Sequence, residues 1–432
     1  MDACAPTVPA RGYGEAVRVL IWHGYLLSGT GSNEYTRALA RTLSLQGHEV
    51  VVLSQDPRPE DHDLGTATAS RPELPGRLPV FVLDHYAQAT PALLPTMDRG
   101  ELDEFIDAQV AAVHAAGPAD LLIANHVLLG GPVGAASGLP FTVKVHGSEL
   151  EYAMRGNHDL CIWARQSLEP AADVVVGSEH VAGVLAELVG PVPARVVTPG
   201  VDVAQMVPEE RSVAWRRLIE EARLDPPNAG DERLPDAGNA ERIERFLAGP
   251  PRSTVVYVGK LSQEKGVHLL LEALAGMDAR AVIVGFGPAR PDLERMAGEL
   301  GLNVLFTGPL QHRHLAHLWA GADASVVPSV FPEAFGMVAA EAAATGCSPV
   351  VARHSGLAEV ADGIQGFLPE HLKGTLSFTR GDALDLRATL TTVLELGPED
   401  RRVLSAGCRA AVESLWSWEA VAGQMLAPVL PR

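Results

Sequence analysis

The sequence predicts an α/β protein with two doubly wound parallel sheets that face each other across a cleft. Short runs of β-branched and other apolar residues alternate with helical segments, and this alternation occurs twice, once before Gly200 and once after about residue 255. The length of 432 residues exceeds what a single hydrophobic core usually organises. We therefore expect two Rossmann-like domains.

Helical segments separate the apolar runs of the first half, which indicates βαβ units and hence a parallel sheet. The predicted strands of this half are Val17 to Trp22, Val50 to Leu53, Val80 to Leu83, Leu121 to Ala124, Phe141 to Val145, Val174 to Val176 and Val196 to Val197.

After Gly200 the alternation stops in a segment rich in Pro, Gly and paired charges, with short helical candidates at Trp215 to Ala222 and Ile243 to Leu247. We interpret it as a partly irregular interdomain segment. The strands predicted beyond it are Val255 to Val258, Ala281 to Val284, Val304 to Phe306, Ser325 to Val327 and Pro349 to Ala352.

These runs suggest three parts of the chain. Residues 1–203 are expected to form an N-terminal Rossmann-like domain, and residues 204–412 a C-terminal Rossmann-like domain. Residues 413–432 are expected to form a helix that crosses back to the N-terminal domain. The oligomeric state stays open.

Composition restricts the function classes. With 47% hydrophobic and 20% charged residues, the chain is in the globular range, which argues against disorder and disulfide scaffolds. The net charge of -19 disfavours nucleic acids and anionic lipid surfaces as partners. Small molecules are the expected partners.

The cellular compartment is predicted from the cysteine pattern and from the signals for export or membrane insertion. Cys4, Cys161, Cys347 and Cys408 lie far apart without metal-ligand spacing, as expected for reduced structural thiols. Met1 to Ala16 show no signal-peptide pattern, and no stretch is long enough to span a membrane. We expect a cytoplasmic protein.

Two lysines follow the first predicted strand of the second half. Val255 to Val258 runs into Gly259-Lys260-Leu261-Ser262-Gln263-Glu264-Lys265-Gly266, and ligands of open parallel sheets bind beyond the carboxyl ends of strands. Lysine is scarce, with four residues against 30 arginines, yet two fall in this window. Both can reach a diphosphate. The alternative is a solvated loop with surface lysines.

Two carboxylates lie eight residues apart downstream. The segment from Pro328 to Glu341 contains Glu333 in a turn and Glu341 in the helix expected to begin near Phe335 or Gly336. Free amides at that helix start can bind an anion or sugar hydroxyls. The alternative to ligand binding is that Glu333 is a charge at the helix N-terminus and Glu341 is a surface residue.

The first half also places polar residues after its strands. The loop Ser28 to Glu34 contains Gly31 and opens a helix, and Asn33 there is a candidate helix cap. His146 follows Phe141 to Val145. Arg155, with two further basic residues at positions 158 and 165, is a candidate for an anionic acceptor, against the alternative of solvated ion pairs.

Together these motifs resemble glycosyltransferase family 4. The resemblance rests on Gly-Lys-Leu-Ser-x-Glu-Lys-Gly from Gly259, on Glu-x-Phe-Gly from Glu333 with a second glutamate eight residues later, on Pro199 to Asp202 and on Gly285 to Pro288. It covers nearly the whole chain and implies a GT-B fold and a retaining, nucleotide-sugar-dependent transfer. In that fold, residues 1–203 would be the acceptor domain and residues 204–412 the nucleotide-sugar donor domain.

The resemblance also implies residue roles. Lys260, in place of the more usual arginine, and Lys265 would hold the donor diphosphate, Glu333 would contact sugar hydroxyls, and His146 would lie near the anomeric carbon. Phe335, Gly336 and Met337 would line the sugar and phosphate through their amides, Glu341 would bind the ribose, and the base would lie near Gly308 to Leu310. The remaining donor-binding residues implied are Gly31 and Gly259. Asn33 would contact the acceptor, with the helix cap as an equal alternative.

A front-face substitution is expected, in which the departing phosphate helps to take the proton of the acceptor while the lysines and helix amides neutralise it. We expect a UDP- or GDP-sugar donor, a small soluble acceptor, no cofactor and no required metal. Asp61-His62-Asp63 imitates a metal-binding motif but lies in a polar loop with no strand directly before it.

Two alternatives remain. A non-catalytic nucleotide-sugar sensor would keep every binding motif, and product release would distinguish it. An NAD(P)-dependent oxidoreductase is suggested by Gly29, Gly31 and Asp56 after the first strands, but Glu34 occupies the position of the third glycine. That alternative also gives the lysines and glutamates no role.

Overall fold

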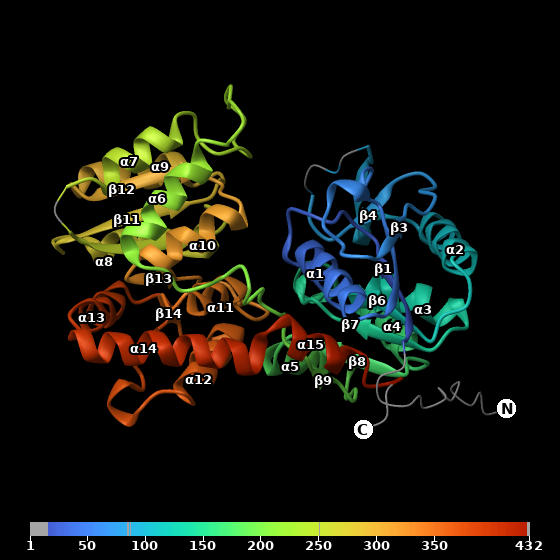
Figure 1. Ribbon diagram of the computed structural model, residues 1–432. Coiled ribbons are helices and arrows are strands. Elements are labelled where there is room, and N and C mark those ends of the chain that lie inside the picture. Colours follow the sequence, from blue (N-terminus) through green and yellow to red (C-terminus); the bar gives the residue numbers. More distant parts are fainter. Residues whose placement is uncertain (1–15, 84–85, 87, 250, 430–432) are drawn as a thin grey trace. The chain divides into compact units, whose positions relative to one another are not determined.

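The computed structural model describes residues 16–83, 86, 88–249 and 251–429 (Figure 1). The chain divides into two compact units, unit 1 (Met1–Gly200 and Trp418–Arg432) and unit 2 (Val201–Ser417). The predictions for the extreme N-terminus and for Cys4 fall outside the described residues. Cys161, Cys347 and Cys408 are free thiols.

Unit 1 is built on a seven-stranded parallel sheet with the order β3-β2-β1-β6-β7-β8-β9. Its strands are β1 (Arg18–His23), β2 (Glu49–Ser54), β3 (Thr68–Ser70), β6 (Leu121–Asn125), β7 (Phe141–Lys144), β8 (Asp173–Val176) and β9 (Arg195–Val196). Its helices are α1 (Gly31–Leu45), α2 (Arg99–Ala115), α3 (Gly131–Ser137), α4 (His158–Leu168), α5 (Glu179–Val189) and α15 (Trp418–Met425), with short helical turns η1 (Pro59–Asp61), η2 (Leu94–Thr96), η3 (His126–Gly130) and η4 (Leu150–Met154).

One predicted strand of unit 1 is wrong. The run Val80 to Leu83 does not join the main sheet: β4 (Leu78–Val80) ends at Val80 and pairs only with β5 (Pro91–Leu93). Val82 and Leu83 are exposed instead. An apolar run alone does not specify a neighbouring strand.

Alternating side chains of β1 pack on the two faces of this sheet. Ile21 lies in the same buried cluster as Leu39 of α1 and Val421 of α15. Trp22 points to the other face, where its ring contacts Phe105 of α2 edge to face. The C-terminal helix α15 thus completes the core of unit 1.

Unit 2 is built on a six-stranded parallel sheet with the order β12-β11-β10-β13-β14-β15. Its strands are β10 (Ser253–Val258), β11 (Ala279–Val284), β12 (Asn303–Gly308), β13 (Ala324–Val327), β14 (Ser348–Ala352) and β15 (Ser377–Phe378). Its helices are α6 (Arg211–Ala222), α7 (Asn239–Leu247), α8 (Val267–Leu274), α9 (Arg290–Glu299), α10 (His312–Gly321), α11 (Met337–Ala344), α12 (Ser355–Gln365), α13 (Ala383–Leu394) and α14 (Pro398–Ala411), with short turns η5 (Gln263–Lys265), η6 (Glu370–Leu372) and η7 (Val412–Trp416).

Helices flank both sheets, which confirms the prediction of two doubly wound α/β domains (Figure 1). The central strands are mostly apolar because both of their faces are covered. In β6 and β14 every residue is buried. The segment interpreted as interdomain carries α6 and α7, and both belong to unit 2.

Each sheet has a topological switch point, where neighbouring connections leave in opposite directions and a crevice opens at the carboxyl ends of the strands. In unit 1 it lies between β1 and β6, and in unit 2 between β10 and β13. The loops that follow these four strands are therefore where ligands should bind.

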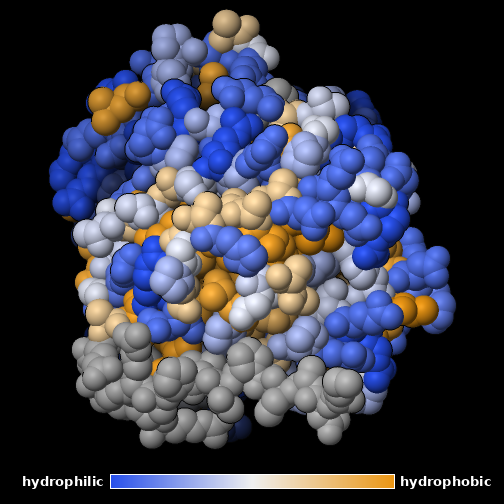
Figure 2. Space-filling model, turned by 90° about the vertical axis from the view of Figure 1, so that its right-hand side faces the viewer, coloured by the Kyte–Doolittle hydropathy of each residue, from blue (hydrophilic) through white to orange (hydrophobic). Residues whose placement is uncertain are grey.

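Among the described helices, none combines the length and the apolar character needed to cross a bilayer. Hydrophobic side chains do reach the surface. Figure 2 shows a face on which they gather in a central band between hydrophilic areas. Tyr152 and Ile162 of unit 1 are among the exposed large apolar side chains.

Candidate functional site

The two motifs singled out in the second half meet at the switch point of unit 2. The amides of Val330 and Phe331, after β13, donate to the carbonyl of Glu264 in the lysine loop that follows β10. Gly266 has a φ of 68°, and a Cβ there would lie 2.1 Å from the carbonyl oxygen of Pro328. Only a glycine allows this close approach of the two loops.

The lysine loop and the carboxylate loop are joined by an ion pair. Nζ of Lys265 donates to Oε1 of Glu333, and both side chains are partly exposed. Lys260 is exposed and has no ion-pair partner among the described residues. Its carbonyl accepts a hydrogen bond from the hydroxyl of Tyr257 in β10. One cation is thus held in place, and the other is available.

Glu333 is fixed by the start of a second helix. Its amide donates to Oγ of Ser355, and its carbonyl accepts from the amide of Gly356, both in the first turn of α12. A Cβ at Gly356 would lie 2.4 Å from Cα of Phe335. Ser355 adopts a positive φ of 47°, an uncommon conformation for this residue type. No sequence motif indicates this support of Glu333 by Ser355 and Gly356.

Unpaired amides lie beside Glu333. Helix α11 begins at Met337 with Gly336 as its N-cap, and the amides of Phe335, Gly336 and Met337 donate to no described residue. Gly336 has a φ of 120°, and a Cβ there would lie 2.8 Å from Cδ2 of Leu357. These amides carry the positive end of the helix dipole and can bind an anion.

The other implied donor residues border the same edge. Glu341 is almost buried in α11, where its Oε1 accepts from Nε2 of His312, the first residue of α10. Gly259 follows β10 and Gly308 ends β12, with β11 between these two strands, and the amide of Gly285 donates to the carbonyl of Gly308. Leu310 lies partly exposed just before α10. Unit 2 thus brings its predicted residues to one edge of the sheet.

In unit 1, the loop after β1 leads into α1, which begins at Gly31. A Cβ at Gly31 would meet no atom within 4 Å, so the space beside it is open. Asn33 is buried instead: its Oδ1 accepts from Nε2 of His23, and its Nδ2 donates to the carbonyl of Ser28. Its amide group thus closes the loop onto β1.

His146 follows β7 and is partly exposed. Its Nε2 donates to Oδ1 of Asn125 at 2.7 Å, and its ring contacts Tyr35 edge to face. Desolvation, reinforced by His126 and Lys144, holds the pKa of His146 well below its usual value. The imidazole is therefore neutral, with Nε2 protonated and Nδ1 available as an acceptor.

A buried cluster behind His146 escaped the sequence analysis. The rings of His23, Tyr25 and His126 lie within 6.0 Å of one another, centroid to centroid, after β1 and β6. His126 has a positive φ of 67°. Neither Oη of Tyr25 nor Nε2 of His126 has a hydrogen-bond partner among the described residues. The available signal was the position of both histidines at strand ends.

Glu149 organises this cluster. Its carboxylate accepts from the amide of His146 at 3.1 Å and from Nδ1 of His126 at 3.2 Å. Burial opposes its ionisation, but the interactions with His126 and the amide outweigh burial and lower its pKa. Lys144 is also buried, its Nζ donating to the carbonyl of Val197. Desolvation lowers the pKa of Lys144 to about 7.

Arg155 is engaged by two carboxylates. Its guanidinium pairs with Glu151 at 2.7 Å and with Glu187 at 2.9 Å, as in the solvated ion pairs that formed the alternative. Asp61 and Asp63 likewise pair with Arg58 and Arg41. Across the described ranges, no cluster of His, Cys, Asp and Glu has an arrangement that could hold a metal ion.

Comparison with known families gives two matches. Residues 29–205 match the family described as Glycosyltransferase Family 4. Residues 240–405 match the family described as Glycosyl transferases group 1. The two matches fall on unit 1 and unit 2 respectively.

Curated relatives cover different shares of the chain. The D-inositol 3-phosphate glycosyltransferase of Mycobacterium bovis is 30% identical over 425 residues, which is 92% of this chain and 78% of that protein. The GDP-mannose-dependent alpha-(1-6)-phosphatidylinositol dimannoside mannosyltransferase of Mycobacterium tuberculosis is 36% identical over 192 residues. That match spans 43% of this chain and less than half, 46%, of the relative.

Solved structures share the fold at low identity. Sucrose-phosphate synthase from Thermosynechococcus elongatus has a TM-score of 0.65 and 21% identity, covering 95% of this chain and 97% of its own. The Anabaena protein HepE in complex with UDP and glucose has a TM-score of 0.67 and 18% identity, covering 95% and 98%. At such identities the likeness concerns the fold alone.

Proposed function

Because the chain belongs to glycosyltransferase family 4 and has the GT-B fold, we propose that it moves a sugar from a nucleoside diphosphate to an acceptor hydroxyl with retention at the anomeric carbon. The observation that carries this proposal is the ion pair of Lys265 and Glu333 beside the open amides of α11. These groups are a cation, an anion-binding helix start and a carboxylate that can accept hydrogen bonds from sugar hydroxyls.

The donor diphosphate would be held by unit 2. Within the described part of the chain no carboxylate pairs with Lys260, so its ammonium group can approach a phosphate. Lys265 would share its three donors between Glu333 and a phosphate oxygen. As the bond to the anomeric carbon breaks, negative charge grows on the leaving phosphate, and preorganised cations and amides stabilise that charge. We propose that these groups suffice without a required metal ion.

Retention would follow from attack on the same face that the diphosphate leaves. The leaving phosphate oxygen would help to take the proton of the acceptor hydroxyl. The neutral His146, anchored by Asn125, would offer Nδ1 to a hydroxyl of the donor sugar. Glu341 would bind the ribose from within α11, held there by His312. Asn33 and Arg155 remain proposed acceptor contacts, although both side chains have partners within unit 1.

The relatives inform the choice of substrate. One is named for GDP-mannose, and one neighbour was solved with UDP, which supports a UDP- or GDP-sugar as the donor. The relative that matches most of the chain is named for D-inositol 3-phosphate. We propose a small soluble polyol or its phosphate as the acceptor, and a cytoplasmic location where nucleotide sugars are made.

A nucleotide-release assay tests the proposal. Purified UDP- and GDP-sugars would be incubated with a panel of polyols and sugar phosphates, with and without a chelator. We expect acceptor-dependent release of one nucleoside diphosphate, unchanged by the chelator, and an α-linked product from an α-linked donor. Donor binding without release under any condition would instead assign a nucleotide-sugar sensor.

A further inference from the structure

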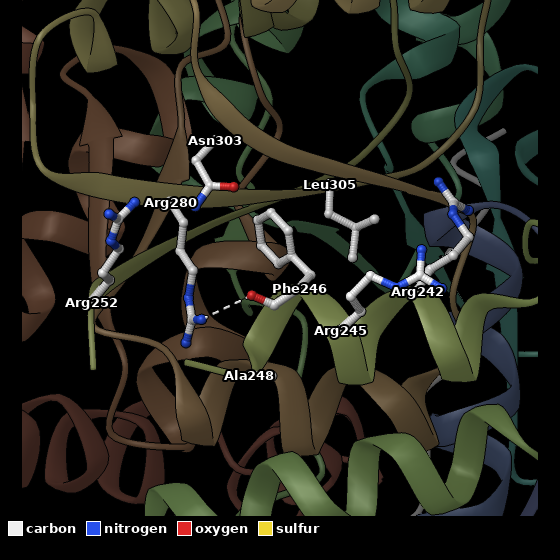
Figure 3. A pocket seen from close by; sticks show the side chains of 8 residues that line it. All are labelled: Arg242, Arg245, Phe246, Ala248, Arg252, Arg280, Asn303 and Leu305. Carbon is white, nitrogen blue, oxygen red and sulfur yellow. Dashed lines mark hydrogen bonds between the residues drawn. The ribbon is translucent and has the colours of Figure 1, made fainter. Parts of the chain in front are cut away.

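A pocket rich in arginine lies at the amino ends of the strands of unit 2. Its walls come from Arg252 just before β10, Arg280 in β11, Asn303 at the start of β12 and the end of α7, and its volume is about 500 Å³ (Figure 3). Strands of this length span about 20 Å. The pocket is therefore separate from the proposed donor residues, which follow the opposite ends of the same strands.

Arg280 is the buried member of this pocket, with 4% of the residue exposed. Its Nε donates to Oγ1 of Thr254, and its Nη1 donates to the carbonyls of Phe246 and Leu247 at the end of α7. No described residue accepts a hydrogen bond from Nη2. The hydrogen bonds to Thr254 and to the last carbonyls of α7 thus use Nε and Nη1 of Arg280 and leave Nη2 for another acceptor.

The charge of Arg280 is incompletely balanced. Desolvation, and then the proximity of Arg211 and Arg252, lower the pKa of Arg280, while Asp323 acts in the opposite direction. Asp323 is itself shared between Arg211 and Arg401. An arginine that stays protonated under these conditions would be stabilised by a further anion.

Two further arginines add positive charge. Arg245 is exposed and has no carboxylate partner among the described residues. Arg252 has a long contact, 3.5 Å, with the highly exposed Asp278. Arg242 at the rim is already engaged by Asp236 at 2.9 Å. These arginines concentrate positive charge in a chain whose net charge is -19.

The remaining wall is apolar. Figure 3 shows Phe246 between the arginines, with Arg252 and Arg280 on one side and Arg242 and Arg245 on the other, and Leu305 nearby. Guanidinium groups bind tetrahedral oxyanions through paired hydrogen bonds. We propose that this pocket binds a phosphate group, either free phosphate or the phosphate of a small metabolite whose carbon skeleton lies on Phe246.

Calorimetry with the full-length protein tests this proposal. Inorganic phosphate and glucose 6-phosphate would be titrated at constant ionic strength into the native protein, Arg245→Ala, Arg252→Ala and the double variant. Both side chains are exposed, so folding should be retained. We expect each substitution to weaken the Kd about tenfold, the effect of losing one charge-assisted contact. Tighter binding of glucose 6-phosphate than of inorganic phosphate would show that the carbon skeleton contacts the apolar wall. Equal binding would show that the pocket recognises the phosphate group alone.

Two controls separate this pocket from other phosphate sites. Arg295→Ala removes an arginine of α9 that is paired with Asp292 and Glu299, and it should leave the Kd unchanged. Lys265→Ala alters the proposed donor site and should also leave this Kd unchanged. No measurable binding at millimolar phosphate would overturn the proposal, as would binding that survives the double arginine variant and is lost in Lys265→Ala.

Discussion

Nζ of Lys265 donates a hydrogen bond to Oε1 of Glu333, although the two residues lie 68 positions apart in the sequence. The contact joins the loop after β10 to the loop after β13, the two strands at the switch point of their sheet. Before any ligand binds, the carboxylate holds the ammonium group in place. A preorganised cation stabilises a leaving phosphate without a reorganisation step.

Lys265→Ala should reduce kcat about 100- to 1000-fold, the usual effect of removing one preorganised donor from developing negative charge. The matched control is Lys373→Ala, because Lys373 pairs with the exposed Glu370 in another part of unit 2. Steady-state kinetics with the donor and acceptor identified by the release assay would measure both. Near-native turnover of Lys265→Ala would remove this lysine from the mechanism.

A double-mutant cycle on Lys265 and Glu333 should show coupling. Glu333→Gln keeps an oxygen that can accept a hydrogen bond but removes the charge that positions the ammonium group. Since each single substitution already breaks the pair, the double variant should lose less kcat/KM than the product of the single losses, with a coupling free energy of about 0.5 to 3 kcal/mol. Independent effects of the two substitutions would show that the pair is incidental.

Lys144→Met should change the pH dependence of stability. The folded-state pKa of about 7, set by desolvation, lies below the ordinary value of 10.5. Between these values the unfolded chain binds more protons, so this lysine makes the free energy of unfolding rise with pH by up to about 1.4 kcal/mol per unit. Urea unfolding at pH 7 and 9 would compare the two proteins, and the native protein should gain more. An equal rise in unfolding free energy for the native protein and Lys144→Met would contradict a lowered pKa of Lys144.

His23→Gln should relieve a loss of stability in acid. Burial, followed by the interaction with His126, lowers the pKa of His23 from 6.5 to about 3. Between these values the unfolded chain binds the extra proton, so the stability that His23 contributes is complete above pH 6.5 and declines as the pH falls towards 3. Glutamine can still donate to Asn33 but does not titrate. Unfolding free energies at pH 6.5 and 4.5 should therefore fall less in the variant, and parallel declines would contradict this account.

Local pattern carried the prediction of both sheets, because interior parallel strands are apolar on both faces and stand out as continuous runs. It failed where a strand is defined by its neighbours. β3 and β15 are too short to show a pattern, and Val80 to Leu83 has the composition of a strand without a place in the main sheet. Such positions depend on tertiary packing more than on propensity.

The residues of the candidate site also fall into those that a local sequence pattern reveals and those that depend on tertiary contacts. The lysine loop and the two glutamates could be found because their residue types and spacing are local. The support of Glu333 by Ser355, and the burial of His126 at a positive φ, depend on contacts between distant segments. Arg155 shows the reverse difficulty: its exposure and its two carboxylate partners follow from neighbours that the sequence does not place.

Gly285→Ala should disturb the loops that follow β10, β11 and β12. Gly285 has a φ of 135°, and a Cβ there would lie 1.9 Å from the carbonyl oxygen of Gly259, so the backbone after β10 would have to move. We expect a loss of about 1 to 3 kcal/mol of stability and a higher KM for the donor. Gly298→Ala is the matched control, since that helical glycine has open space around it and alanine should be neutral or stabilising. Thermal unfolding and donor KM of both variants would decide, and a native-like KM in Gly285→Ala would place the donor away from these loops.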